Sequence, residues 1–183
     1  MHASLRVAIL ALLAICFLNC SFAKQINPMA YGKILKIEEF GNYYLIGGSD
    51  ILYIFHKNGT LANFLEIPML SDFTVFENTI VVSSYSQQFP NIRCYTFPEL
   101  KLLWEFEPKM KVFDEYLVWH EIEPRSWRVK KIDNYIGVCS GYSFYILDKN
   151  GRIINQFDAE NDLWDFIKKD SKYYLASQNG YIY

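Results

Sequence analysis

Hydrophobic and polar residues alternate along most of this chain, in short runs separated by Gly, Asn, Asp and Ser. Alternation with a period of two is typical of β-strands with one buried face, and the many aromatic and β-branched residues favour strands as well. The first four runs predict strands at 32–40, 42–49, 51–57 and 60–67.

The same cycle of runs recurs along the chain. Its second strand reads "NYYLIGGS", then "NTIVVSSYS", then "NYIGVCSG", then "KYYLASQN", beginning at Asn42, Asn78, Asn134 and Lys172. The first and last intervals are similar, whereas the middle interval is longer. We assign the surplus to residues 111–132, which predict an inserted hairpin of "EYLVWHEI" and "WRVKKI" around a turn at 123–126.

Two Asn-Gly pairs mark equivalent bends in this repeat. Asn58-Gly59 and Asn150-Gly151 align without a gap, each between alternating apolar runs. Asn-Gly in this setting is a strong hairpin signal, and it favours a type I′ turn with positive φ at both central residues. Thr60 also completes a glycosylation sequon, so Asn58 is a candidate glycosylation site, although the turn alone explains the Asn-Gly pair.

Repeated units of four antiparallel strands predict an all-β fold of the β-propeller type, in which blades pack face to face. The chain supplies about three and a half blades, an incomplete circle by the usual count of four to eight. The run at 163–169 has apolar residues at helical spacing, but it falls where a first strand belongs, so we expect a strand there. Further blades would come from a longer chain or another copy.

Residues 1–23 have the layout of a secretory signal peptide: Arg6, an apolar run, and a small-x-small exit. Removal would leave 24–183 as a partial propeller that is secreted, periplasmic or at the cell surface, or in the lumen of the secretory pathway. An uncleaved signal helix would anchor the chain in a membrane through residues 7–23. Lipidation of Cys20 is disfavoured because bulky residues precede it.

The composition narrows the function further. The chain has 183 residues, 51% of them hydrophobic, so a sizeable core is expected. A formal net charge of −2 argues against nucleic acid as a partner. Cys94 and Cys139 would remain after signal removal. They could pair in an oxidising compartment, but apolar strand contexts are more typical of two buried free thiols.

Residues suited to catalysis are scarce. No Cys/His cluster has zinc-site spacing, and no nucleophile elbow or phosphate-binding loop is present. His120 with Glu121 and Glu123 lacks a fixed ligand pattern, and the acidic run 158–165 lacks the Gly and distal Glu of a calcium loop. We therefore expect no catalytic, cofactor-binding or metal-binding residues.

Residues 141–157, "GYSFYILDKNGRIINQF", resemble the repeat of the pyrroloquinoline-quinone-like propeller family, whose pattern is Gly-x-x-Tyr-x-Leu-Asp-x-x-x-Gly followed by a Trp. The matching residues are Gly141, Tyr145, Leu147, Asp148 and Gly151. Phe157 stands near the place of the closing Trp, and Trp104 is the candidate for that place in the second unit. The resemblance implies a propeller repeat and not the quinone cofactor, because nothing here matches the dedicated cofactor ligands.

These observations favour a non-enzymatic, extracytoplasmic propeller that binds a protein partner or acts as a scaffold. The inserted hairpin departs from the repeat, so we expect contacts near it, at Trp119, Arg125, Trp127 and Arg128. Ordinary inside/outside alternation of a strand also explains the last two. The alternatives are a fragment of a larger quinoprotein-type enzyme and a ligand-binding sensor ectodomain.

Overall fold

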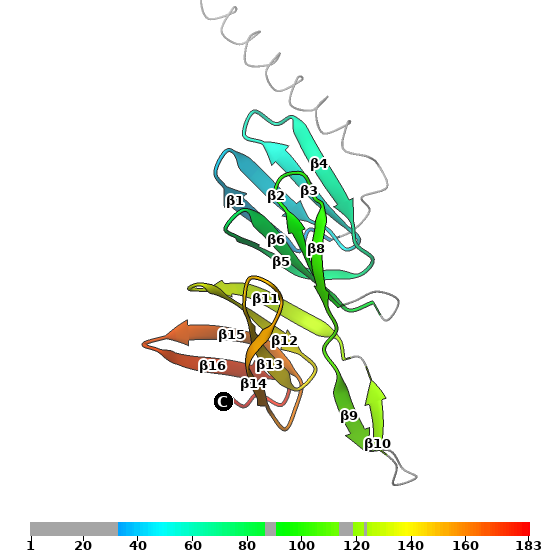
Figure 1. Ribbon diagram of the computed structural model, residues 1–183, viewed down its shortest axis with the longest axis vertical. Coiled ribbons are helices and arrows are strands. Elements are labelled where there is room, and N and C mark those ends of the chain that lie inside the picture. Colours follow the sequence, from blue (N-terminus) through cyan, green and yellow to red (C-terminus); the bar gives the residue numbers. More distant parts are fainter. Residues whose placement is uncertain (1–32, 87–90, 114–118, 123) are drawn as a thin grey trace, which may run out of the picture. The chain divides into compact units, whose positions relative to one another are not determined.

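The computed structural model describes residues 33–86, 91–113, 119–122 and 124–183. The expected signal helix at 1–23 lies outside these ranges. Every regular element of the described residues is a β-strand, which confirms the all-β prediction (Figure 1). No helix suited to crossing a membrane occurs in this described part.

Antiparallel sheets follow one another along the chain, and strands adjacent in sequence are adjacent in each sheet. The first sheet contains β1 (Lys36–Phe40), β2 (Tyr43–Gly47), β3 (Ile51–His56) and β4 (Leu61–Glu66). The second contains β5 (Leu70–Phe76), β6 (Thr79–Ser84), β7 (Ile92–Thr96) and β8 (Leu102–Phe106). The third contains β11 (Ser126–Ile132), β12 (Tyr135–Ser140), β13 (Ser143–Leu147) and β14 (Ile153–Asp158).

A fourth sheet is present in part. It pairs β15 (Leu163–Lys169) with β16 (Lys172–Ser177), and a bridge between Ala176 and Ile182 begins a third strand. The run at 163–169 is therefore a first strand, as expected. The array of about three and a half blades is confirmed over the described residues.

The inserted hairpin differs from the prediction. It consists of β9 (Met110–Phe113) and β10 (Trp119–Ile122), and it projects beyond the four-stranded sheets (Figure 1). Residues 127–132, predicted as its second strand, instead belong to β11, which pairs with β12. The reason is the two-residue turn between these strands, where Asp133 adopts a φ of 51°. This turn brings Ile132 opposite Tyr135, so the insertion ends before β11.

The two Asn-Gly bends are equivalent, as predicted, but they are not type I′ turns. Gly59 N donates to His56 O (2.9 Å), and Gly151 N donates to Asp148 O (3.0 Å). The two glycines have φ of 87° and 78°, whereas the asparagines before them do not have positive φ. Each bend is thus a type I turn closed by a glycine bulge.

Side chains explain the turn type. Asn58 Oδ1 accepts hydrogen bonds from Thr60 N (3.0 Å) and Thr60 Oγ1 (2.7 Å). Asp148 Oδ1 accepts from Asn150 N (2.8 Å) and Arg152 N (2.9 Å), and these bonds lower the pKa of Asp148. Asn58 is the third residue of its turn and Asp148 the first residue of the other, and such local bonds from Asn and Asp side chains to the backbone stabilise turns.

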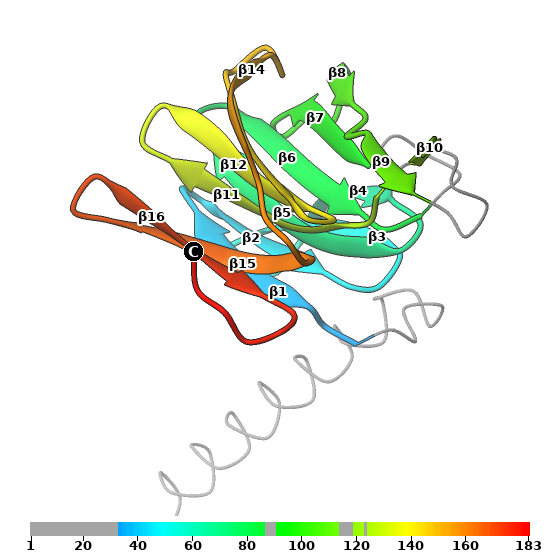
Figure 2. The same cartoon turned by 90° about the horizontal axis from the view of Figure 1, so that it is seen from below.

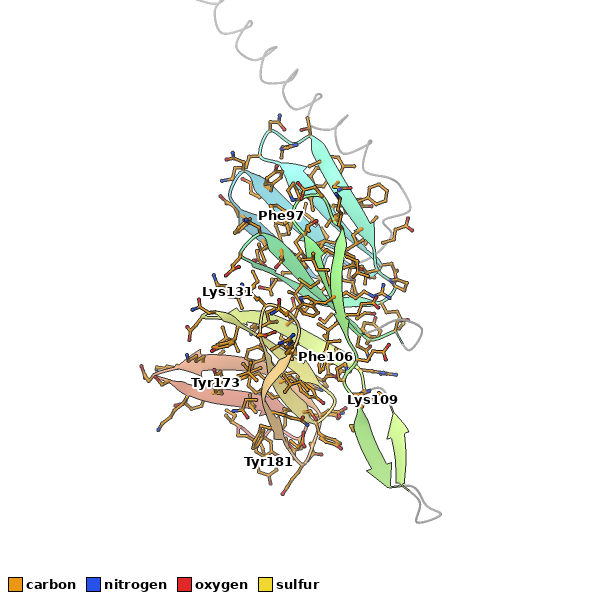
Figure 3. All side chains as sticks on the ribbon, viewed as in Figure 1. Phe97, Phe106, Lys109, Lys131, Tyr173 and Tyr181 are labelled. Carbon is orange, nitrogen blue, oxygen red and sulfur yellow. The ribbon has the colours of Figure 1, made fainter. Side chains whose placement is uncertain are left out.

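Three separate hydrophobic clusters hold the sheets together, each between two successive sheets. Phe73 packs with the first sheet, Val129 with the second and Phe166 with the third. Side chains fill the space between sheets (Figure 3), as where Phe106 of β8 contacts Tyr145 of β13 with ring centroids 5.3 Å apart. The core is therefore divided into layers that alternate with the sheets.

The sheets converge at their first strands. β1 contacts β5, β5 contacts β11, and β11 contacts β15. The last strands β4, β8 and β14 are mostly exposed, and β8 and β14 lie at the rim (Figure 2). The first strands are thus the inner strands of the array, where residues from different sheets meet.

Candidate functional site

A bulge interrupts three of the inner strands at one equivalent position. The register shifts between Leu70 and Asp72 in β5, and likewise at 126–128 in β11 and 163–165 in β15. A bulge adds one residue to a strand and re-aims its side chain. The added residues are Ser71, Trp127 and Trp164, so the repeat places two indoles at the same point of neighbouring sheets.

An aromatic surface, which we define as Tyr85, Arg125, Trp127 and Trp164, surrounds these bulges. Trp127 stacks on Tyr85 with centroids 5.9 Å apart and lies 6.2 Å from the ring of Trp164. The guanidinium of Arg125 lies 6.0 Å from the Trp127 ring, within reach of a cation–π contact. Trp164 is 52% exposed.

One polar atom within this surface is unsatisfied. Trp127 Nε1 is buried and has no hydrogen-bond partner among the described residues. A buried donor without an acceptor costs about 1–3 kcal/mol.

A charge row runs across the inner strands beside the bulges, with one residue from each sheet: Lys36, Asp72, Arg128 and Asp165. Lys36 Nζ lies 3.4 Å from Asp72 Oδ1, and Arg128 lies 3.6 Å from Asp72 Oδ2. Arg128 Nε lies 3.4 Å from Asp165 Oδ1. The sign of the charge alternates from each sheet to the next.

Asp72 is the buried centre of the charge row, with a side chain only 2% exposed. Its carboxylate accepts hydrogen bonds from Phe73 N (2.8 Å) and from Val129 N (3.2 Å) of the next sheet. Burial raises the pKa of Asp72, while Lys36 and Arg128 oppose that rise. The Asp72 carboxylate thus links β5 to both β1 and β11.

The outer strands β4 and β8 are each linked to the following sheet by a side-chain hydrogen bond. Asn63 Nδ2 of β4 donates to Pro98 O (3.1 Å), and Trp104 Nε1 of β8 donates to Lys149 O (2.9 Å). Both acceptors lie in the turn between the third and fourth strands of the following sheet. Asn63 in β4 and Trp104 in β8 occupy equivalent positions in the pairing between the third and fourth strands of their sheets. Asn155 occupies the corresponding position in β14.

A hollow of about 380 Å³ lies between the third and fourth sheets, on the side of β14 and β16. Its lining is mainly apolar and includes Phe144, Phe157, Tyr173 and Tyr183 with Asn155. It borders Tyr183, which follows the bridge between Ala176 and Ile182 in the last sheet.

Three of the four residues predicted to make contacts lie in the aromatic surface or the charge row. Arg125 and Trp127 belong to the aromatic surface, and Arg128 belongs to the charge row. Trp119 lies in β10, opposite Phe113, and its side chain is outside the described residues. Asn58 lies in the exposed turn described above. Whether these residues bind or carry anything remains a prediction.

Sequence reasoning missed Tyr85 and Trp164. Tyr85 follows β6 with no motif to mark it. Trp164 aligns with Trp127 when the first strands of the repeat are superposed, and this repeated indole was the signal available. In the acidic run around it, Asp165 pairs with Lys130, and Asp158 accepts a hydrogen bond from Ser143 (2.7 Å).

Groups suited to metal chemistry do not converge in the described part of the chain, where no three His, Cys, Asp or Glu residues are placed to hold an ion. His56 packs against Tyr43 with centroids 4.9 Å apart. The inner-strand carboxylates face cations and backbone amides.

Cys94 and Cys139 are both buried and free, as the apolar strand contexts suggested. Burial raises the pKa of Cys94 to about 11 and raises that of Cys139 still further. Because the thiolate is the reactive form, we expect neither residue to be alkylated by iodoacetamide at pH 8 in the folded protein, and both to react fully in urea. Peptide mapping by mass spectrometry measures this. Similar labelling of either residue in the two states would contradict the assignment.

Comparison with known proteins supports the fold. No known family's sequence profile matches the chain, and no curated protein matches its sequence. BamB from Moraxella catarrhalis is similar in structure, with a TM-score of 0.62 and 17% identity over 80% of this chain and 41% of BamB. The computationally designed Ika4 protein has a TM-score of 0.66 and 10% identity, over 84% of this chain and 90% of Ika4.

The WD40 domain of Neurospora crassa Pan2 is also similar, with a TM-score of 0.54 and 10% identity over 82% of this chain and 50% of that domain. The chain therefore spans less than half the length of BamB and half that of the Pan2 domain. At these identities the likeness shows a propeller-type repeat fold. The pyrroloquinoline-quinone-like family remains a prediction.

Proposed function

We propose that this chain is a non-enzymatic propeller that binds a protein partner outside the cytoplasm, and that the aromatic surface makes the contact. The observation that carries this proposal is the pair of bulge indoles, with Trp164 half exposed over Trp127 and Arg125 beside it. The few residues that dominate the binding energy of protein interfaces are enriched in Trp, Tyr and Arg. An extracytoplasmic location follows from the signal-peptide interpretation of residues 1–23.

The β9–β10 hairpin supports the same proposal. It leads through Pro124 directly to Arg125, so the hairpin and the aromatic surface are continuous along the chain. A methyl group at Gly141 would lie 2.7 Å from Pro124 Cβ and 3.0 Å from Met110 Sδ. The base of the hairpin is thus packed on the third sheet, which holds it ready to extend the contact.

Capture of a partner with the immobilised full chain tests the proposal. Trp164→Ala should reduce the captured protein about tenfold or more, because truncation at an interface hot spot costs about 2 kcal/mol or more. The extract should come from the extracytoplasmic fraction of the source cells, with the captured protein identified and its binding measured. Deleting residues 110–122 should weaken the same complex.

The matched control is Ile154→Ala in β14, which removes a side chain that is 55% exposed and distant in the repeat from the bulges. It should leave capture unchanged. Both variants should keep the wild-type urea midpoint. Equal binding by Trp164→Ala and the wild type would refute the role of the aromatic surface, and conversion of a small molecule by the pure chain would favour the enzyme alternative.

A further inference from the structure

The bend between β3 and β4 exposes a chemical group that the fold does not use. Asn58 and Thr60 are both exposed at this bend. Asn58 Oδ1 accepts the two hydrogen bonds from Thr60, whereas Asn58 Nδ2 donates none to any residue within the described ranges. The amide nitrogen of Asn58 is therefore available at the surface of the folded chain.

The equivalent bend of the third sheet provides a comparison within the same chain. Asn150 and Arg152 are exposed there in the positions of Asn58 and Thr60. Arg152 uses its backbone N–H to hold this bend, at 2.9 Å from Asp148 Oδ1. The same turn thus forms without a hydroxyl group at this position, and the Thr60 side chain needs a further explanation.

Glycosylation supplies that explanation. Asn58, Gly59 and Thr60 form the acceptor sequence in which carbohydrate is attached to the Asn side chain. Such acceptors belong on surface loops of secreted proteins. The linkage uses Nδ2 and leaves Oδ1 unchanged, so a glycan on Asn58 would preserve both hydrogen bonds from Thr60. The bend therefore combines an exposed acceptor with a conformation that attachment does not disturb.

We propose that Asn58 carries an N-linked glycan. The donor is an oligosaccharide joined through a diphosphate to a lipid, and a transferase of the secretory pathway catalyses the transfer. Asn58 Nδ2 loses one proton and forms a bond to the anomeric carbon of the first sugar. The bond between that carbon and the diphosphate oxygen breaks, and the lipid diphosphate leaves with the electron pair.

The position of Asn58 separates this site from the aromatic surface. His56 lies opposite Tyr43, so the β3–β4 bend is at the same end of the first sheet as the β1–β2 turn. Lys36, at the start of β1, lies beside Asp72, near the start of β5, so the first two sheets run in the same direction. The bulges lie at this starting end and Asn58 lies at the opposite end. A glycan would therefore leave the aromatic surface accessible.

Peptide mapping of the full chain tests the site. The protein would be purified from its source cells and, with its own residues 1–23, from the medium of a eukaryotic cell line. Mass spectrometry should show carbohydrate on the peptide that contains Asn58, and peptide N-glycosidase should release it and leave Asp at that position. Asn19 begins a second acceptor sequence but lies within 1–23, so the mapping distinguishes the two.

Matched variants, secreted from the same cell line, separate the acceptor sequence from the fold. Thr60→Val keeps the shape of the side chain and removes its hydroxyl, so the glycan should be lost completely while the circular dichroism spectrum is unchanged. Thr60→Ser keeps an acceptor sequence and should retain the glycan. Arg152→Thr completes an acceptor sequence at the equivalent bend, where a second glycan should appear on Asn150.

An unmodified Asn58 in the protein from its source cells would overturn the proposal, and so would a glycan that persists in Thr60→Val. Replacing residues 1–23 with a well-characterised signal peptide identifies the reason for an unmodified Asn58. A glycan that appears only then would refute the signal-peptide interpretation, which is the one premise shared with the proposed function. A glycan that is still absent would show that the bend itself is not an acceptor.

Discussion

Phe73→Ala is expected to lower the free energy of unfolding by about 3–5 kcal/mol, the range for a buried Phe truncated to Ala. The side chain is fully buried between the first two sheets. A methyl group at Gly47 would lie 2.7 Å from Phe73 Cε1, so the ring rests directly on the backbone of β2. Truncation would leave a cavity that rigid sheets close poorly. Urea denaturation followed by tryptophan fluorescence measures the change.

The matched control is Phe64→Ala in β4, where the ring is 49% exposed. Its expected cost is about 1 kcal/mol or less, because truncations at the surface leave no cavity. Circular dichroism should give the same midpoints as fluorescence. Equal destabilisation by the two substitutions would show that the layer between the first two sheets is not the packed core described here.

Gly151→Ala should be the other strongly destabilising change, by about 2–4 kcal/mol from backbone strain and overpacking together. Gly151 has a φ of 78°, which L-residues rarely adopt. A methyl group there would lie 2.7 Å from Trp104 Cε3. Trp104 also donates its hydrogen bond to the carbonyl of Lys149, so displacing the indole breaks the tie between the second and third sheets.

Gly180→Ala separates the contribution of backbone strain from that of overpacking. Gly180 has a φ of 82° but nothing within 4 Å of the added methyl group, so only the backbone strain remains. Its expected cost is about 1–2 kcal/mol. Thermal unfolding of both variants under the same conditions gives the comparison. If Gly151→Ala cost no more than Gly180→Ala, the contact with Trp104 would contribute nothing to stability.

Local signals in the sequence predicted the strands, their meander order and the equivalence of the two Asn-Gly bends. These features depend on residues adjacent in the chain, such as the alternation within β2 and the Gly at the end of each bend. The turn type was wrong because side-chain acceptors at Asn58 and Asp148 decide it. Periodicity alone does not carry that information.

The boundary of the insertion was wrong for a related reason. Alternation in 127–132 predicts a strand but not its partner, and the Asp133-Asn134 turn that determines the partner lacks a glycine. The charge row was not foreseen either. Its members lie in different sheets, far apart in the chain, and only the stacking of the sheets brings Lys36, Asp72 and Arg128 together.

The three layered cores carry a consequence for how the protein comes apart. Because each cluster joins only two successive sheets, stability is a sum of nearest-neighbour contributions, as in linear repeat proteins. The inner sheets are held on both faces, whereas the terminal sheets are held on one. Unfolding should therefore begin at the terminal sheets and proceed to the inner ones. Any group that covers the outer face of a terminal sheet would then stabilise the whole array.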